Sequence, residues 1–256
     1  MPCRVTSQDA GVSRDTESGV AGLQRGTMDA QRPSGFCVAE LVRLQSLPDN
    51  AQLARVLDTA EYNRLVGIRK ALRQRQFSGG HWLVRQLACE RFGGSPTDWQ
   101  WRSSPDGEPS LRREGHAICV SVSHSGDWLA CAISSEPVGI DVEVLTRERD
   151  WVSLADYAFP SEVIAEWRDL TPRQRKWKFI NWWCLHEARC KREGRGIHLG
   201  VLRQLRLLPC LPTACEAMSW PLPDGFLALA GRADVVLRGC ADQRSWWRFE
   251  DVTKIE

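Results

Sequence analysis

Two carboxylates stand at alternate positions of a short apolar segment, PVGIDVEVL (137–145). The segment is predicted to be a strand, whose side chains alternate between two faces, so Asp141 and Glu143 share a face and lie about 6–7 Å apart. Carboxylates this close repel each other unless a cation or a proton lies between them. They form either the solvated face of a half-buried strand or two oxygen ligands for a hard cation such as Mg²⁺.

A third carboxylate, Glu187, belongs to the segment LTPRQRKWKFINWWCLHEARCKR (170–192), which we expect to be a helix. Thr171 suits the N-cap, Pro172 suits the first helical position and Gly194 suits the C-terminal cap. An apolar stripe follows the helical spacing along this segment. Its members are Trp177, Ile180, Cys184 and Ala188.

The face on which Glu187 lies decides between a surface ion pair and a buried site. At about 100° per residue, Glu187 and Lys191 continue the apolar stripe, whereas His186 lies on a different side. A carboxylate that faces the core must be paired, hydrogen-bonded or metal-bound. We therefore predict that Glu187 and Lys191 serve one buried site and that His186 does not. From this helix alone, a buried structural pair is the alternative.

The stretch SVSHSGDW (121–128) is predicted to end a strand in a tight polar turn. Its hydroxyls, imidazole and backbone N–H groups suit a phosphate, and the alternative is a simple turn with an exposed His124. A Ser-His-Asp hydrolase is not indicated, because the chain has no G-x-S-x-G motif. The basic segment RLVGIRKALRQRQ (64–76), taken alone, is interpreted as a solvated helix face.

The elements that must position these residues follow one another in two α+β halves. Residues 1–34 have few large apolar side chains and are predicted to be disordered. Helices are predicted over 50–92 and around 154–167, and a hairpin or loop over 105–111. Strands are predicted over 116–125, 128–134, 138–145, 225–239 and 245–252.

The composition excludes several classes of protein. Hydrophobic residues make up 43% of the 256 residues and charged residues 26%, which is ordinary for a soluble globular protein. The net charge of +2 gives no argument for nucleic acid. No apolar run reaches the roughly 18–20 residues of a membrane span, and the N-terminus lacks a signal-peptide core, so we expect a cytoplasmic protein. The ten cysteines include no C-x-x-C pair and are interpreted as free thiols.

Taken in order, the motifs GEP, SHSGDW, VGIDVE and WWCLHEARCKREGRGI resemble the 4′-phosphopantetheinyl transferase superfamily, and most of all its surfactin-synthetase-associated type. The similarity covers most of residues 36–245, and the G-I-D-x-E and E-A-x-x-K motifs are its specific parts. The resemblance implies an α+β fold, a pseudo-dimer of two similar α/β subdomains in one chain. The subdomains would be residues 35–136 and 137–256, after the extension 1–34.

The resemblance also implies roles for single residues. Three would be ligands of Mg²⁺, or of Mn²⁺: Asp141, Glu143 and Glu187. Five would bind coenzyme A, the substrate, mostly through its phosphates: Arg75, Arg85, Ser123, His124 and Lys191. In catalysis, Glu187 or a water at the metal would accept a serine proton, and Lys191 would stabilise the leaving 3′,5′-ADP.

The implied activity is that of a holo-[acyl-carrier-protein] synthase, in secondary metabolite biosynthesis. The 4′-phosphopantetheine arm of coenzyme A would pass to a serine of an apo acyl or peptidyl carrier protein. We expect a monomer with no nucleic-acid or membrane partner. Two positions depart from the family pattern, since His186 and Glu108 stand where the family has lysines. The alternatives are a non-catalytic relative that binds coenzyme A or a carrier, and a metal-dependent phosphohydrolase.

Overall fold

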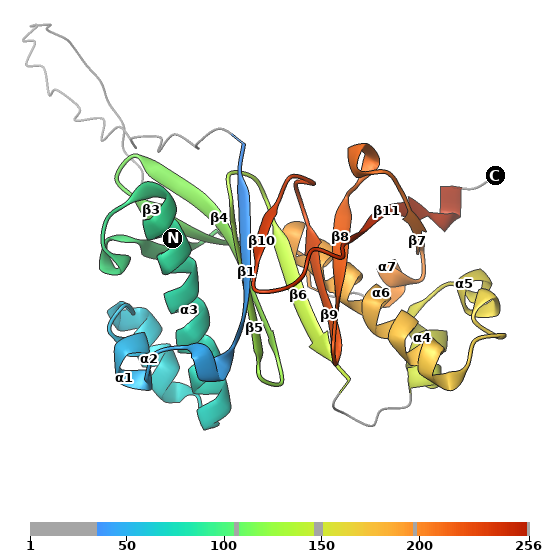
Figure 1. Cartoon of the computed structure of the whole chain (residues 1–256), viewed down its shortest axis with the longest axis horizontal. Coiled ribbons are helices and arrows are strands. Elements are labelled where there is room, and N and C mark those ends of the chain that lie inside the picture. Colours follow the sequence, from blue (N-terminus) through green and yellow to red (C-terminus); the bar gives the residue numbers. More distant parts are fainter. Residues whose placement is uncertain (1–34, 105–107, 146–150, 197–198, 255–256) are drawn as a thin grey trace, which may run out of the picture.

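Two β-sheets lie next to each other in the centre of the molecule, and helices lie on their outer sides (Figure 1). The computed structural model describes residues 35–104, 108–145, 151–196 and 199–254. The predicted extension over residues 1–34 lies outside these ranges. The architecture is α+β with two helix-and-sheet units in one chain, as predicted.

The first sheet has the strand order β10-β1-β5-β4-β3-β2. Its strands are β1 (Cys37–Arg43), β2 (Gln100–Ser103), β3 (Pro109–Arg113), β4 (His116–Ser125), β5 (Trp128–Ser134) and β10 (Val236–Arg238). The helices of this unit are α1 (Asn50–Ala54), α2 (Thr59–Gly67) and α3 (Ala71–Phe92). Strand β10 pairs in parallel with β1, so the sheet includes a strand from beyond the predicted subdomain boundary at residue 136.

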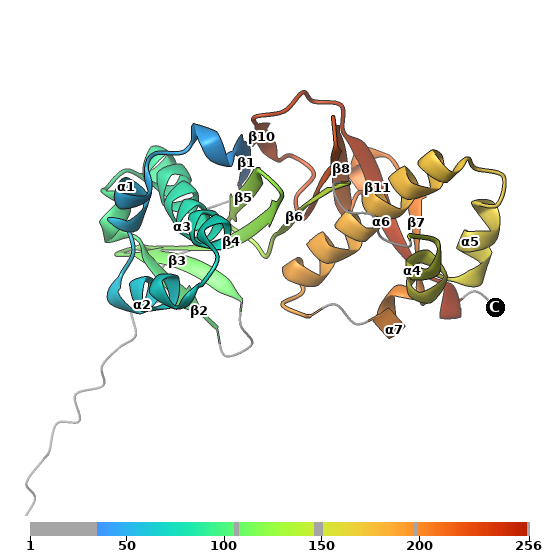
Figure 2. The same cartoon turned by 90° about the horizontal axis from the view of Figure 1, so that it is seen from below.

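The second sheet has the order β6-β9-β8-β11-β7, and α6 lies along one of its faces (Figure 2). Its strands are β6 (Gly139–Val144), β7 (Leu205–Pro209), β8 (Ala217–Leu222), β9 (Gly225–Ala230) and β11 (Ser245–Asp251). The helices of this unit are α4 (Trp151–Ala158), α5 (Ser161–Glu166), α6 (Pro172–Arg192) and α7 (Leu199–Leu202). No helix within the described ranges is long and apolar enough to cross a membrane.

The apolar face of β6 packs between the two sheets. Val138, Ile140, Val142 and Val144 join one buried cluster with residues of β1, β5, β8 and β9. The alternation predicted for this strand is therefore confirmed, and the side chains of Asp141 and Glu143 point to the other face, toward α6. This leaves the carboxylates between a strand and a helix.

The helical prediction over residues 50–92 is confirmed, with two breaks. The breaks lie at residues 55–58 and 68–70. Asp49 begins α1, and Asp58 begins α2 after the first break, each by accepting a hydrogen bond from the first turn of its helix. The helical region around 154–167 is two helices, because Pro160 disfavours helical backbone at the residue before it. Strands β2 and β3, on either side of the predicted hairpin or loop, pair antiparallel, and residues 105–107 between them lie outside the described ranges. Strands β1, β2, β7 and β8 were not predicted. The nine described cysteines are free thiols, as expected.

A buried ion network fastens α2 to α3. Arg85 of α3 is 1% exposed, and its Nη2 donates to both carboxylate oxygens of Glu61 at 2.8 and 2.9 Å. His81 contacts the same carboxylate through Nδ1. Arg85 Nε also donates to the Trp99 carbonyl oxygen at 3.0 Å. Because every member is hydrogen-bonded, the network can lie in the core without an uncompensated charge.

Helix α6 approaches β6 at Gly139 so closely that no side chain fits between them. Thr171 and Pro172 begin this helix with a capping box, and Gly194 follows its end with φ +65°, so the predicted caps are confirmed. A Cβ atom on Gly139 would lie 1.8 Å from the Ala188 carbonyl oxygen. The short approach lets Glu187 and Lys191 reach the carboxylates of β6.

Replacing Gly139 by alanine is expected to destabilise the protein by about 1–3 kcal/mol or more, because backbone rather than a flexible side chain blocks the new methyl group. Urea unfolding would measure the loss. Gly67→Ala is the matched control, since nothing lies within 4 Å of a Cβ at that position. Equal stability of the two variants would contradict the close packing of α6 on β6.

Candidate active site

Three carboxylates meet where α6 crosses β6. Asp141 and Glu143 come from the strand and Glu187 from the helix, and one ligand atom of each lies within 4.8 Å of the others. Asp141 is 1% exposed, whereas Glu143 and Glu187 are half-buried. The structure thus brings together the three residues that the sequence proposed as metal ligands.

Lys191 faces the same cluster but pairs with Asp141. Its Nζ donates to Asp141 Oδ1 at 2.7 Å and to the Ile140 carbonyl oxygen at 3.0 Å. Burial by itself lowers the pKa of Lys191, but Asp141 and Glu187 outweigh it and raise this pKa above its usual value. The lysine is therefore a charged ammonium group. One ammonium cannot balance the charge of all three carboxylates once they are ionised.

The oxygen atoms of the cluster suit a hard cation. Asp141 Oδ2 is buried and finds no hydrogen-bond partner among the described residues. Burial, followed by the charge of Asp141, raises the pKa of Glu187 to about 8. An unpartnered buried oxygen beside two further carboxylates is the donor set that Mg²⁺ prefers. The residues present therefore fit the metal that the resemblance implied.

Ser123 does not have the position expected for a phosphate contact. It is buried, and its Oγ donates to Asp141 Oδ1 at 2.7 Å while it accepts from the Val142 amide at 3.3 Å. The next serine, Ser125, donates to Glu143 Oε2 at 2.8 Å. The predicted turn begins later than expected, because β4 continues through Ser125. Ser123 thus supports a carboxylate rather than a substrate phosphate.

His124 points to the opposite face of β4 and lines a cavity of about 470 Å³. Arg73 Nη1 contacts both ring nitrogens of His124, and Nε2 is the nearer of the two. Burial, followed by the charge of Arg73, lowers the pKa of His124 to about 4, so the imidazole is neutral at pH 7 and accepts from the arginine. Arg69, Lys70 and Trp101 line the same cavity. The cavity combines cations with an aromatic wall.

Arg75 and Arg85 are corrections to the predicted nucleotide contacts. The Arg75 guanidinium donates to the carbonyl oxygens of Leu44, Leu47 and Pro48 and to Asn50 Oδ1. Arg85 is buried against Glu61. Both guanidinium groups hold the fold together and neither lines the cavity at His124.

Arg69, Lys70 and Arg73, rather than those two arginines, line the cavity at His124. These residues belong to the basic segment 64–76, which was predicted from the sequence to be a solvated helix face. The chain breaks between α2 and α3 at residues 68–70, so Arg69 and Lys70 precede α3 instead of lying on one face of a continuous helix. That break depends on packing as much as on composition.

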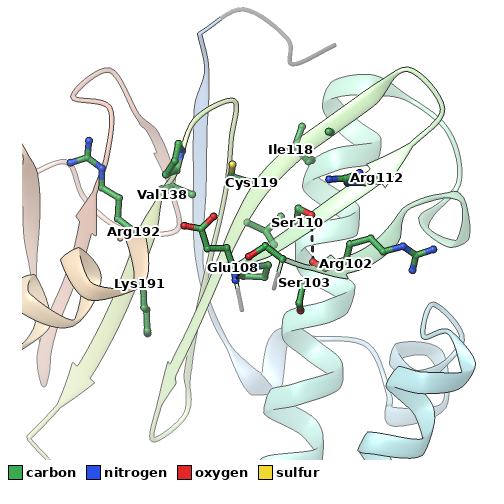
Figure 3. Close-up of a pocket in the computed structure, with 15 residues that line it drawn as sticks. Arg102, Ser103, Glu108, Ser110, Arg112, Ile118, Cys119, Val138, Lys191 and Arg192 are labelled. Atoms are coloured by element: carbon green, nitrogen blue, oxygen red, sulfur yellow. Dashed lines mark hydrogen bonds between the residues drawn. The ribbon is translucent and has the colours of Figure 1, made fainter. Parts of the chain in front are cut away.

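A second, smaller cavity of about 140 Å³ opens beside Lys191 (Figure 3). It lies between β2, β3 and β4 and the C-terminal end of α6, where Arg102, Arg112 and Arg192 add positive charge. Glu108 lies between these elements, and its side chain fills the space beside Gly194. Glu108, which stands where the family pattern has a lysine, therefore lines a cavity whose other charged residues are cations.

His186 is separated from the site, as the helix geometry predicted. It is 1% exposed, and its ring lies 5.7 Å from that of Phe159 and 5.5 Å from that of Phe249. Burial lowers its pKa to about 3. The residue is a neutral part of the aromatic core behind α6.

Comparison with known proteins finds sequences similar to this chain among the 4′-phosphopantetheinyl transferases. No protein-family model matches the chain. A 4′-phosphopantetheinyl transferase of Bacillus subtilis is 27% identical over 120 residues, 47% of this chain and 52% of that protein. The transferase HetI of Nostoc sp. is 27% identical over 184 residues, 69% of this chain and 76% of HetI. The transferase psf-1 of Bacillus pumilus is 30% identical over 125 residues, 48% of this chain and 51% of psf-1.

The chain spans about half the length of most of the curated relatives it matches. Among solved structures, the holo-[acyl-carrier-protein] synthase of Thermotoga maritima aligns with 18% identity and a TM-score of 0.30. The alignment covers 44% of this chain and 77% of the synthase chain. That likeness is weak, and the architecture above rests on this chain's own strands and helices. The chain is thus similar in sequence to several 4′-phosphopantetheinyl transferases, which supports the superfamily that its motifs resemble.

Proposed function

We propose that the chain transfers the 4′-phosphopantetheine arm of coenzyme A to a serine hydroxyl of an apo acyl or peptidyl carrier protein and releases 3′,5′-ADP. The observation that carries this proposal is the cluster of Asp141, Glu143 and Glu187 with Lys191 beside it. All four residues stand at the motif positions of the superfamily. An unpartnered buried oxygen on Asp141 supports a cation site there.

Asp141, Glu143 and Glu187 would hold Mg²⁺, or Mn²⁺, which when bound neutralises charge on the diphosphate of coenzyme A. The cations of the larger cavity, Arg69, Lys70 and Arg73, are suited to the phosphates of the nucleotide. Trp101 in the same wall can stack against an aromatic base. Lys191 borders the smaller cavity and also reaches Asp141, so it can contact a diphosphate between the two cavities.

In the reaction, the serine oxygen forms a bond to the β-phosphorus while the bond from that phosphorus to the oxygen of 3′,5′-ADP breaks. Glu187, whose carboxylate lies beside Asp141 and Glu143, accepts the serine proton as general base. Lys191 carries a fixed positive charge toward the leaving phosphate. We place this reaction in the cytoplasm and assign it to a monomer with subdomains over residues 35–136 and 137–256, of which the second lends strand β10 to the sheet of the first.

Mass spectrometry of apo carrier proteins tests the proposal. After incubation with coenzyme A, Mg²⁺ and this protein, a carrier is expected to gain the mass of one phosphopantetheine. A panel of fatty-acid, polyketide and peptide carriers would identify the pathway. No mass gain on any of them would reject transfer. Release of phosphate from coenzyme A without a carrier would instead indicate a phosphohydrolase, and calorimetric binding without transfer would indicate a non-catalytic relative.

A further inference from the structure

Backbone amides on the free edge of β6 donate to side-chain hydroxyls rather than to the backbone of another strand. β6 is an outer strand of the second sheet, and β4 of the first sheet lies beside its free edge. Three β6 amides, those of Ile140, Val142 and Val144, donate to three hydroxyls of β4. The acceptors are the hydroxyl oxygens of Ser121 at 3.0 Å, Ser123 at 3.3 Å and Ser125 at 3.2 Å. We call these three residues the serine ladder.

Two serines of the ladder also donate a hydrogen bond to a carboxylate. Ser123 donates to Asp141 Oδ1 at 2.7 Å, and Ser125 donates to Glu143 Oε2 at 2.8 Å. At the level of Ser121 the residue on the carboxylate face is Gly139, which has no side chain to receive a bond. The spacing of the serines therefore matches the spacing of the carboxylates, because both strands repeat every two residues.

We propose that Ser123 and Ser125 are positioning residues that orient the metal-binding carboxylates and couple them to the contact between the two sheets. This inference rests on the metal site of the proposed function. Ser123 and Lys191 both hold Asp141 Oδ1, so the remaining oxygen, Oδ2, has no hydrogen-bond partner among the described residues. Ser125 restricts Glu143 in the same way. A ligand held in this orientation has less rotational freedom to lose when a cation binds.

The ladder also links metal affinity to the docking of the sheets. The hydroxyls belong to the first sheet and the carboxylates to the second, so each orientation exists only while the sheets are in contact. By thermodynamic reciprocity, a cation that binds the oriented carboxylates stabilises that contact to the same extent. Metal binding is therefore expected to raise the unfolding temperature of the whole chain.

Calorimetric titration of the full chain with Mn²⁺ tests this inference, together with thermal unfolding with and without the metal. Ser123→Ala and Ser125→Ala are each expected to raise the dissociation constant about 10–100-fold, the usual loss when a partner of a metal ligand is removed. Both variants should also lose most of the metal-induced rise in unfolding temperature. Ser125→Thr keeps the hydroxyl and should bind Mn²⁺ like the unmodified chain.

Ser121→Ala is the matched control, because it removes the same kind of amide acceptor but no carboxylate bond. It should lower stability while the dissociation constant stays within about threefold of the unmodified value. If Ser121→Ala weakens Mn²⁺ binding as much as Ser123→Ala does, the serines are merely structural and the inference is overturned. Unchanged Mn²⁺ affinity in both Ser123→Ala and Ser125→Ala would overturn it as well.

The metal titration separates this inference from the proposed transfer. Suppose that Mn²⁺ affinity falls in Ser123→Ala and Ser125→Ala but the unmodified chain modifies no carrier. That result would support the positioning role and reject the transferase activity. A chain that modifies carriers yet binds no metal would reject the positioning role and leave the transfer in place.

Discussion

Replacing Glu187 by glutamine is expected to slow phosphopantetheine transfer by about 10³-fold or more while the chain stays folded. The variant keeps the shape of the side chain but removes a ligand charge and the proton acceptor. Bound metal ions contribute several kcal/mol to reactions of this kind, and about 4 kcal/mol corresponds to a factor of 10³. Single-turnover transfer to an apo carrier, followed by mass spectrometry, would measure the rate.

The same variant should be at least as stable as the unmodified chain when no metal is present. Glu187 lies among like charges, and burial raises its pKa to about 8, so the ionised carboxylate is unfavourable there. A glutamine amide removes that repulsion and can donate to Asp141 Oδ2, which otherwise has no partner. Stability that is traded for activity in this way is typical of functional sites.

Glu193→Gln is the matched control on the same helix. Glu193 caps α6 and pairs with Arg189 at the surface, away from the carboxylate cluster. Its substitution should leave the transfer rate unchanged and alter stability by less than about 1 kcal/mol. A Glu187→Gln variant that transfers at the rate of Glu193→Gln would remove Glu187 from the mechanism.

Replacing Glu61 by alanine is expected to cost about 3–5 kcal/mol of unfolding free energy, because it leaves the buried Arg85 guanidinium without its counter-charge. This is a large part of the roughly 5–15 kcal/mol that stabilises a typical domain. Urea unfolding at pH 7 would measure it. Glu114→Ala, at an exposed position, is the control and should change stability by less than about 0.5 kcal/mol.

The contribution of Glu61 also has a defined pH dependence. Burial by itself raises the pKa of Glu61, but hydrogen bonds from His81 and the Asp58 amide, together with Arg85, outweigh burial and lower the pKa to about 2. A group with a lowered pKa binds fewer protons when folded, so its stabilisation is present above the usual value of 4.5 and is lost as pH falls toward 2. The stability difference between Glu61→Ala and Glu114→Ala should shrink over that window. A constant difference would mean that Glu61 contributes by packing alone.

The sequence by itself determined which carboxylates could meet. Asp141 and Glu143 share a face because a strand repeats every two residues, and Glu187 lies on the core side because a helix advances about 100° per residue. The helix caps at Thr171 and Gly194 were predictable for the same reason, since capping depends on a few adjacent residues. The separation of His186 from the site followed from the same count.

Only the tertiary structure decided which partners the polar groups find. Ser123 orients Asp141 because β4 lies along the edge of β6, a contact between segments that no local pattern encodes. Lys191 pairs with Asp141, on another element, and Arg75 and Arg85 bind the first unit's own backbone and Glu61. Strand β10 pairs with β1 in the first sheet, although most of the chain lies between these two strands in the sequence. Local periodicity specifies a side chain's direction, whereas its partner depends on how separate elements dock.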